Sequence, residues 1–294
     1  MTSVAGKTAF ITGGGSGVGF GQAQVFAEAG CKVAIADIRQ DHLDEAMAHF
    51  EGTGAEVLPI RLDITDRAAY AQAADKVEAE LGPVQLIFNT AGVSIFGPMQ
   101  NATPEDWEWQ LNVNVWGVIN GVHTFLPRML DRGDDCHIVN TASMSAFVAL
   151  KGTGLYCTTK MAVRGYSECL ALDLADTRVR VSMLCPGAVN TNIHEAVLTR
   201  PAHLGATGYY GADPEVLAHL KDVISVGMEP DQLARHVLKG VEADQFYILP
   251  YPEFRETLDE IHGRVMNALA KPEDDPDYAK RVAHGVPGGK RKEG

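Results

Sequence analysis

The sequence lacks a basic surplus and any long apolar run, and each absence excludes a class of protein. Its 294 residues carry 25 Lys and Arg against 38 Asp and Glu, which gives a formal net charge of −13. A nucleic-acid binder needs a basic face to displace counterions from phosphates, and a protein that docks on anionic lipid needs one too. No apolar run approaches the roughly 18 residues of a membrane span. We therefore expect neither a nucleic acid nor a membrane as a partner.

Cysteine is also scarce, and the five cysteines are scattered: Cys31, Cys136, Cys157, Cys169 and Cys185. Because their number is odd and no two form a C-x-x-C pair, the sequence predicts neither a disulfide framework nor a zinc site, and we expect no other metal. Residues 1–7 lack the basic start and apolar stretch of a signal peptide. These features are typical of a reducing compartment, and we expect a cytoplasmic protein.

Short apolar runs alternate with longer amphipathic segments along most of the chain. The runs lie at 8–11, 33–36, 57–60, 86–88, 138–139, 181–184 and 247–249, and the segments between them include 21–29, 41–50, 68–81, 104–130, 155–174 and 230–241. Most runs are continuously apolar, which is typical of strands covered on both faces, as in a parallel sheet. The alternation predicts βαβ units, and therefore an α/β fold with helices on both faces of the sheet.

The chain has no linker that would separate two domains before about Pro250. We expect one domain over residues 1–250, followed at 251–294 by an extension with one helix and a polar tail. Residues 190–228 are rich in glycine and proline and show poor periodicity. A long irregular insertion in an α/β domain is more often a substrate lid than a structural strut, so we expect a lid there.

A glycine-rich turn directly follows the first predicted strand and opens the first predicted helix. It reads Thr12-Gly13-Gly14-Gly15-Ser16-Gly17-Val18-Gly19. Glycine lets the backbone approach a pyrophosphate without a Cβ clash, and the free N–H groups of the helix N-terminus bind that anion. The candidate contacts are Gly13, Ser16, Gly17, Val18 and Gly19. Taken alone, the turn is equally consistent with a purely structural role, but the strand before it and the helix after it favour a dinucleotide site.

An acidic residue, Asp37, ends the second predicted strand, 20 residues after Gly17. A carboxylate at this position binds the ribose hydroxyls of adenosine and repels a 2′-phosphate. No Lys or Arg lies inside the glycine turn, although Arg39 is close enough to support some NADP binding. We therefore expect NAD as the cofactor and leave NADP open. The alternative role for Asp37 is to cap the helix that follows it.

Tyr156 and Lys160 are four residues apart and lie on one face of a predicted helix. A free phenol has a pKa of about 10, too high for a base at neutral pH, and a neighbouring ammonium lowers that pKa. Ser143 precedes Tyr156 by 13 residues and offers a hydroxyl that can hold the substrate oxygen. Asn114 lies in the long middle helix, where a structural role is as plausible as a functional one.

Together, these motifs resemble the short-chain dehydrogenase/reductase family over about residues 7–249. The resemblance implies a single Rossmann-like, doubly wound domain with a seven-stranded parallel sheet. It implies a catalytic tetrad of Asn114, Ser143, Tyr156 and Lys160. It also implies cofactor contacts from Asp63, Ile64, Asn89, Tyr156, Lys160, Val189 and Thr191. Thr90 departs from the family's Asn-Asn-Ala-Gly motif, and the family's habit of pairing subunits through two long helices implies a homotetramer or homodimer.

A narrower resemblance, to the Cα-dehydrogenases of bacterial lignin breakdown, rests on the segments 96–98, 200–202 and 248–255. It implies interconversion of a bulky, benzylic secondary alcohol and its ketone with NAD, as in the Cα-oxidation of β-aryl ethers. Apart from Ser143, the expected substrate contacts are apolar or aromatic: Phe96, Met144, Phe147, Leu150, Tyr209 and Tyr210. Two alternatives stay open, namely an enzyme for another bulky ketone such as a hydroxysteroid, and a non-catalytic regulator that binds NAD.

Overall fold

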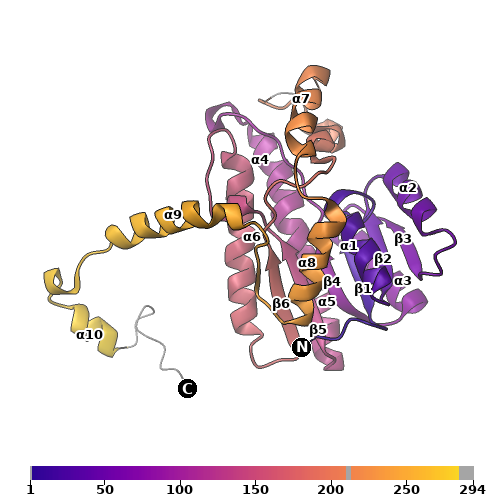
Figure 1. The fold of residues 1–294 in the computed structure, drawn as a ribbon, viewed down its shortest axis with the longest axis horizontal. Helices are drawn as coiled ribbons and strands as arrows, with labels where there is room; N and C mark the ends of the chain where they lie inside the picture. Colours follow the sequence, from indigo (N-terminus) through magenta and orange to yellow (C-terminus); the bar gives the residue numbers. More distant parts are fainter. Residues whose placement is uncertain (1, 210–212, 285–294) are drawn as a thin grey trace. The chain divides into compact units, whose positions relative to one another are not determined.

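Seven parallel strands form one sheet, in the order β3-β2-β1-β4-β5-β6-β7. The strands are β1 (Thr8–Thr12), β2 (Lys32–Asp37), β3 (Val57–Arg61), β4 (Val84–Asn89), β5 (Cys136–Thr141), β6 (Val179–Leu184) and β7 (Tyr247–Ile248). The computed structural model describes residues 2–209 and 213–284, and the chain divides into two compact units, 1–252 and 253–294. The sheet lies in the first unit (Figure 1). All the predicted strands are present, and the predicted α/β fold with a seven-stranded parallel sheet is confirmed.

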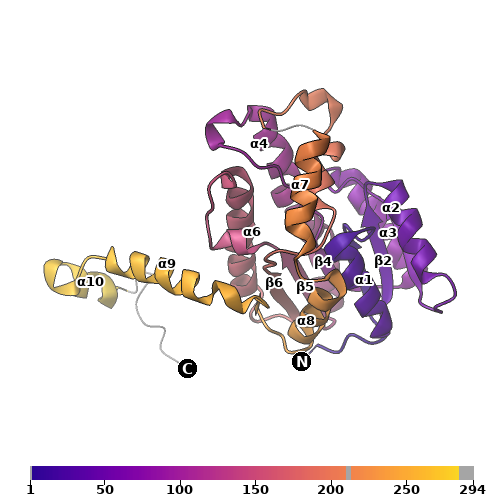
Figure 2. The same cartoon turned by 45° about the horizontal axis from the view of Figure 1, so that its top comes forward.

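The order of the strands decides which helices share a face. The chain moves across the sheet in one direction from β1 to β3 and in the other from β4 to β6. Right-handed crossovers therefore place α1 (Gly17–Glu28) and α2 (Gln40–Phe50) on one face, and α3 (Arg67–Leu81), α5 (Gly117–Arg132) and α6 (Gly154–Asp173) on the other. The helix α8 (Pro230–Glu242) packs along α1 (Figures 1 and 2). The direction reverses between β1 and β4, which is where ligands bind in open α/β sheets.

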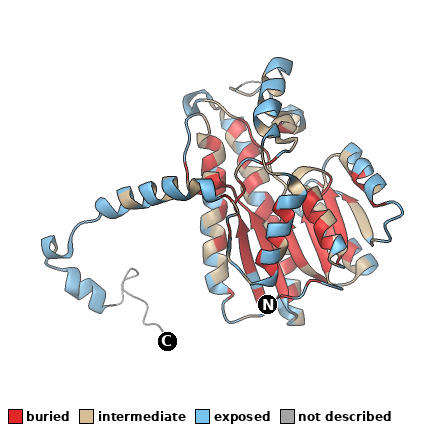
Figure 3. Ribbon diagram, in the orientation of Figure 1, coloured by how far each residue is buried: buried red, intermediate tan, exposed pale blue. Residues whose placement is uncertain are grey.

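Both faces of the sheet are buried, as the continuously apolar strands predicted. Every residue of β1 is buried, and buried residues concentrate in the strands and the inward sides of the flanking helices (Figure 3). On the α3 and α5 side, the rings of Phe10 and Phe125 lie 4.9 Å apart, and Tyr70 packs against both. On the α1 side, the rings of Phe26 and Phe88 lie 4.6 Å apart. Close-packed aromatic pairs on both faces make the strand ends a rigid platform for a site.

The helix predicted over 104–130 is interrupted. It consists of α4 (Pro104–Leu111), a π-helical turn, η2 (Asn112–Trp116), and then α5. The start of α4 is set by a capping box between Thr103 and Asp106. A π turn inserts one extra residue into a helix, which the apolar period does not reveal, and such turns are frequent at functional sites.

The two ends of the expected lid segment, residues 190–228, lie next to each other. Val189 pairs with Met228 in an isolated parallel bridge, and the Asn190 N–H donates to the Met228 carbonyl at 3.0 Å. Between these points lie η4 (Ile193–Thr199), η5 (Ala202–Leu204) and α7 (Pro214–Ser225). The helix α7, which the irregular pattern did not predict, begins with Asp213 as its cap. In Figures 1 and 2, α7 and α4 lie at the same end of the unit.

The second unit contains two α-helices among its described residues, α9 (Arg255–Asn267) and α10 (Tyr278–Ala283), with the short 3-10 turn η7 (Pro272–Asp274) between them. The sequence predicted one helix here, because a segment as short as α10 gives no usable periodicity. Across 2–209 and 213–284, no helix is both long and apolar enough to cross a membrane.

Candidate active site

The glycine turn has the backbone geometry of an anion cradle. Gly17 has a φ of +51°, which favours glycine, and a Cβ added to Gly19 would lie 2.2 Å from the Gly13 carbonyl oxygen. Ser16 precedes α1 but makes no side-chain capping bond, and its hydroxyl donates to Asn192 Oδ1 at 3.1 Å. The backbone N–H groups at the start of α1 are therefore left for an anion, so this turn fits a pyrophosphate.

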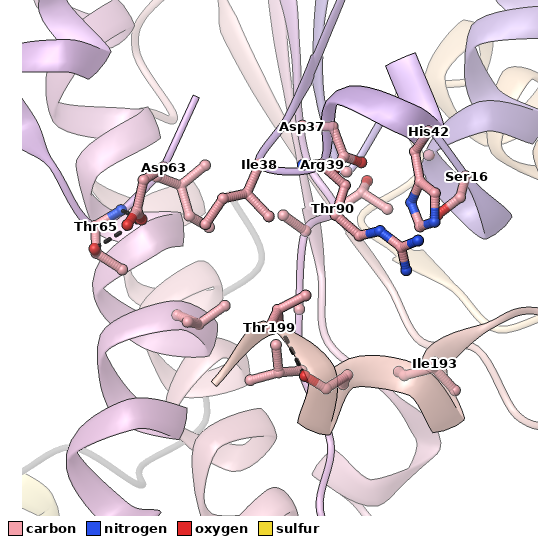
Figure 4. Close-up of a pocket in the computed structure, with 18 of the residues that line it drawn as sticks. Ser16, Asp37, Ile38, Arg39, His42, Asp63, Thr65, Thr90, Ile193 and Thr199 are labelled. Carbon is pink, nitrogen blue, oxygen red and sulfur yellow. Dashed lines mark hydrogen bonds between the residues drawn. The ribbon is translucent and has the colours of Figure 1, made fainter. Parts of the chain in front are cut away.

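A cavity of about 450 Å³ runs from this turn along the carboxyl ends of the strands. It is lined by most of the residues predicted to bind the cofactor: Gly13, Ser16, Gly17, Val18, Gly19, Asp37, Asp63, Ile64 and Thr191. Figure 4 shows Ser16, Asp37 and Arg39 along one side of the cavity and the lid helix η4 along the other. The cavity thus lies between the carboxyl ends of the strands and the expected lid segment.

The Asp37 carboxylate is held in place at the end of β2 by two backbone groups. It accepts the N–H of Gly15 at 3.2 Å and the N–H of Arg39 at 3.0 Å. The Arg39 side chain donates to Asp41 and to Glu195 of the lid, the latter at 3.1 Å. The hydrogen bond from Arg39 lowers the pKa of Asp41 to about 2, so this carboxylate stays charged at neutral pH.

Asn89 does not line the cavity. Its side-chain amide donates to Asn140 on the neighbouring strand at 2.8 Å and stabilises the end of β4. The segment after β4 is positioned instead by Thr12, whose hydroxyl oxygen accepts the N–H groups of Thr90 at 2.9 Å and Ala91 at 3.1 Å. Thr90 and Ala91 line the cavity, and sequence reasoning missed both of them and Thr12.

The departure from the family motif at Thr90 has a local structural partner. The Thr90 hydroxyl donates to Gln22 of α1 at 2.7 Å and lies 3.1 Å from the Thr141 hydroxyl at the end of β5. Gln22 is fully buried, so its amide oxygen requires a donor. Thr90 therefore ties α1 to two strand ends beneath the cavity.

Ser143, Tyr156 and Lys160 converge at the carboxyl end of β5. The Ser143 hydroxyl, which donates to the Pro186 carbonyl at 3.4 Å, is close enough to Tyr156 to act to lower its pKa, and Lys160 Nζ lies 5.5 Å from the centroid of the Tyr156 ring. Lys160 Nζ also donates to the Thr141 carbonyl at 3.0 Å. Burial raises the pKa of Tyr156 to about 12 and lowers that of Lys160 to about 8. The phenol is therefore protonated here, and an added positive charge would lower its pKa.

Asn114 lies in the π turn and clamps the segment after β4. Its Oδ1 accepts the N–H of Val93 at 2.8 Å, and its Nδ2 donates to the Val93 carbonyl at 2.9 Å and to Thr159 at 3.0 Å. A Cβ added to the adjacent Gly92 would lie 3.3 Å from Asn114 Oδ1 and 3.5 Å from Lys160 Nζ. Asn114 therefore has the structural role that the sequence left open, because it holds the segment after β4 in place. It also lies close to the ammonium group of Lys160.

Only some of the expected substrate residues lie near Tyr156. The Phe96 ring lies 6.1 Å from the Tyr156 ring, and Tyr209 packs directly on the backbone of Gly97. Phe147 instead packs under the guanidinium of Arg164, at 4.1 Å. Of the remaining candidates, Met144 is buried, Leu150 is exposed and Tyr210 lies outside the described residues. Phe96 and Tyr209 are therefore the aromatic side chains best placed near Tyr156.

The lid is anchored to α4 by a buried ion pair that the sequence did not reveal. Arg200 Nη1 lies 2.8 Å from Asp106 Oδ1, and the guanidinium covers the Trp109 ring. An apolar cluster extends this contact through Val93, Ile95, Trp109, Ala196 and Leu204. Trp109 of α4 and Ala196 and Leu204 of the lid segment also line the cavity, so this cluster supplies part of its apolar lining.

Comparison with known proteins places the chain in a family. A model of the short chain dehydrogenase family matches residues 7–201. The C alpha-dehydrogenase of Sphingobium sp. (strain NBRC 103272 / SYK-6) is 42% identical over 276 residues, which cover 94% of this chain and 90% of that protein. The chain belongs to the short-chain dehydrogenase family, an NAD(P)-dependent family, and it is a short-chain oxidoreductase.

Solved structures give the same assignment. The crystal structure of the apo form of LigO from Sphingobium sp. strain SYK-6 matches with a TM-score of 0.81 and 51% identity, covering 97% of each chain. A short-chain dehydrogenase/reductase from Burkholderia phymatum in complex with NAD matches with a TM-score of 0.86 and 33% identity, covering 94% of this chain and 99% of that one. The predicted family resemblance is confirmed, including the similarity to a Cα-dehydrogenase.

Proposed function

We propose that this protein interconverts a bulky, benzylic secondary alcohol and its ketone with NAD, with Cα-oxidation of lignin-derived β-aryl ethers as the favoured reaction. The observation that carries the proposal is the convergence of Ser143, Tyr156 and Lys160 at the end of β5, where the aromatic ring of Phe96 lies 6.1 Å from the Tyr156 ring. Similarity to the Sphingobium C alpha-dehydrogenase supports the substrate class. The neighbour crystallised with NAD, together with Asp37 at the end of β2, supports NAD over NADP.

Most of the residues that would hold NAD line the cavity, whereas Lys160 and Val189 are not part of its lining. The N–H groups at the start of α1 would bind the pyrophosphate, Asp37 the adenosine ribose, and Asp63 and Ile64 the adenine. Lys160 would bind the nicotinamide ribose, with Val189 and Thr191 near the carboxamide. When bound, the nicotinamide accepts the hydride in alcohol oxidation and supplies it in ketone reduction.

The side chains of the site handle the proton. Once ionised to the phenolate, Tyr156 Oη takes the hydroxyl proton of the alcohol, and the Ser143 hydroxyl holds the same substrate oxygen and stabilises its developing charge. The ammonium of Lys160, close to the Tyr156 ring, favours the phenolate. Asn114 keeps the segment beside Lys160 in place through its bonds to Val93. In ketone reduction, the phenol returns the proton to the substrate oxygen.

A direct assay tests the proposal. We expect the absorbance of reduced nicotinamide to appear when the protein is mixed with NAD and a β-aryl-ether benzylic alcohol, and turnover to fall as the aryl group is replaced by methyl. A hydroxysteroid and a small aliphatic alcohol serve as comparison substrates. Faster turnover of the hydroxysteroid would contradict the substrate class. NAD binding by calorimetry without turnover of any substrate would instead indicate a regulator.

We further propose that the protein is a homodimer or homotetramer built on the long helices α5 and α6. Large apolar side chains are exposed on this surface: Trp116, Leu130, Met161 and Leu172. Met161→Glu is expected to dissociate the oligomer, since it places a charge in an apolar contact. Sedimentation velocity at micromolar concentration measures this. Val223→Glu, at an exposed position of α7, is the matched control, and a monomeric wild type would contradict the proposal.

A further inference from the structure

Arg39 lies at a position where an arginine side chain favours the binding of NADP. It follows Asp37 by two residues and lines the cavity, the kind of position from which an arginine accommodates the 2′-phosphate of NADP. Figure 4 shows its guanidinium extending into the cavity from the strand that carries Asp37. Among the described residues that line this cavity, no other Lys or Arg occurs. Whether the site admits a 2′-phosphate therefore depends on what this guanidinium contacts.

Two carboxylates already hold the guanidinium. Nε and Nη2 donate to Asp41, and Nη1 donates to Glu195 Oε2 at 3.1 Å. Asp37, which accepts the backbone N–H of Arg39, adds a third carboxylate nearby, so the formal charge of this group of four side chains is 1 − 3 = −2. A phosphate monoester carries about −1.5 to −2 at neutral pH, so the cluster as it stands repels a 2′-phosphate.

The two carboxylates that accept hydrogen bonds from the Arg39 guanidinium come from different parts of the chain. Asp41 is a neighbour of Arg39 in the chain, whereas Glu195 lies 156 residues away on the lid helix η4. The lid is also joined to the glycine turn through the bond from Ser16 to Asn192, so it delivers Glu195 to the ribose end of the cavity. Glu195 thus completes the charge cluster only because the lid lies over this end.

We propose that Glu195 is a cofactor-specificity residue, which selects against NADP by holding the Arg39 guanidinium in an ion pair. The inference rests on the proposed use of NAD. Without Glu195, Nη1 is free to bind a 2′-phosphate and the cluster loses one negative charge. The side chains of Arg39 and Glu195 are 29% and 37% exposed, so water screens the pair and the effect is moderate, about three- to fivefold in affinity.

Calorimetric titration of NAD and NADP in the absence of substrate tests this role of Glu195. Glu195→Gln is expected to lower the Kd for NADP by about three- to fivefold and to change the Kd for NAD by less than about twofold. Glu108→Gln is the matched control, because Glu108 lines the same cavity but is not one of the carboxylates that hold Arg39. We expect it to leave the ratio of the two Kd values unchanged.

A double substitution separates the proposed route from a general charge effect. In an Arg39→Ala background, Glu195→Gln is expected to give no gain in NADP affinity, since the guanidinium that would bind the phosphate is absent. An unchanged NADP affinity in Glu195→Gln would overturn the inference, as would an equal gain in Glu108→Gln or a gain that persists without Arg39. A wild type that binds neither nucleotide would overturn the proposed function itself, which is a distinct result.

Discussion

Tyr156→Phe is expected to lower turnover of a benzylic alcohol by about 10²–10⁴-fold, the range for loss of an acid–base group, while NAD binding stays nearly intact. The substitution keeps the ring, and with it the packing against Phe96 and the contact with Lys160. It removes only the hydroxyl that exchanges the proton and bonds to Ser143. Binding and chemistry should therefore separate cleanly in this variant.

Single-turnover and steady-state rates measured alongside the Kd for NAD give the test of Tyr156. Tyr166→Phe is the matched control, because Tyr166 lies on the same helix and packs against the core on the far side of the sheet from α1. It should keep near-normal turnover. If Tyr156→Phe also turned over substrate at nearly the normal rate, another group would have to carry the proton and the assigned role of Tyr156 would be wrong.

Lys160→Met is expected to abolish activity and yet stabilise the cofactor-free protein at pH 7 by about 2 kcal/mol. Burial lowers the pKa of Lys160 from its ordinary 10.5 to about 8, so below pH 8 the fold holds a desolvated ammonium. A shift of that size corresponds to about 3 kcal/mol. The bond to the Thr141 carbonyl offsets about 1 kcal/mol of this, and Met, of similar length, removes both contributions.

The pH dependence of unfolding shows whether Lys160 is the cause. Between pH 8 and pH 10.5 the unfolded chain binds the proton more tightly than the native protein, so the wild type should gain stability as pH rises through this range. Lys160→Met should lack that gain, and its advantage should shrink toward pH 10. Urea unfolding at pH 7 and pH 9.5 measures both. A variant less stable than the wild type at pH 7 would contradict the predicted cost of the buried ammonium.

Features that depend on short stretches of chain were predictable from the sequence. The continuously apolar strands follow from burial on both faces, and the glycine turn follows from the backbone approach that Gly17 and Gly19 allow. Tyr156 and Lys160 share a helix face because their spacing matches one helical turn. In each case the physical cause acts between residues a few positions apart, and the sequence displays it directly.

The tertiary structure alone decided which distant residues meet. The Asn89 side chain donates to Asn140 and does not line the cavity, because strand register sets which side chain faces the cavity. The segment after β4 is held by the Thr12 hydroxyl. Neither the π turn at η2 nor the helix α7 shows a clear apolar periodicity in the sequence.

The charge contacts of the lid depend most on the folded chain. Arg39 meets Glu195 across 156 residues, and Arg200 pairs with Asp106 in a buried contact with α4. A charged residue has many possible partners in a sequence, and only the path of the chain selects one. The sequence by itself determined the fold and the family, because local sterics and burial decide the strands, the helices and the glycine turn, while the acid–base role of Tyr156 stays a prediction. The tertiary structure decided where the segment 190–228 lies against the cavity and which charges it brings there, because those contacts exist only once distant segments are packed.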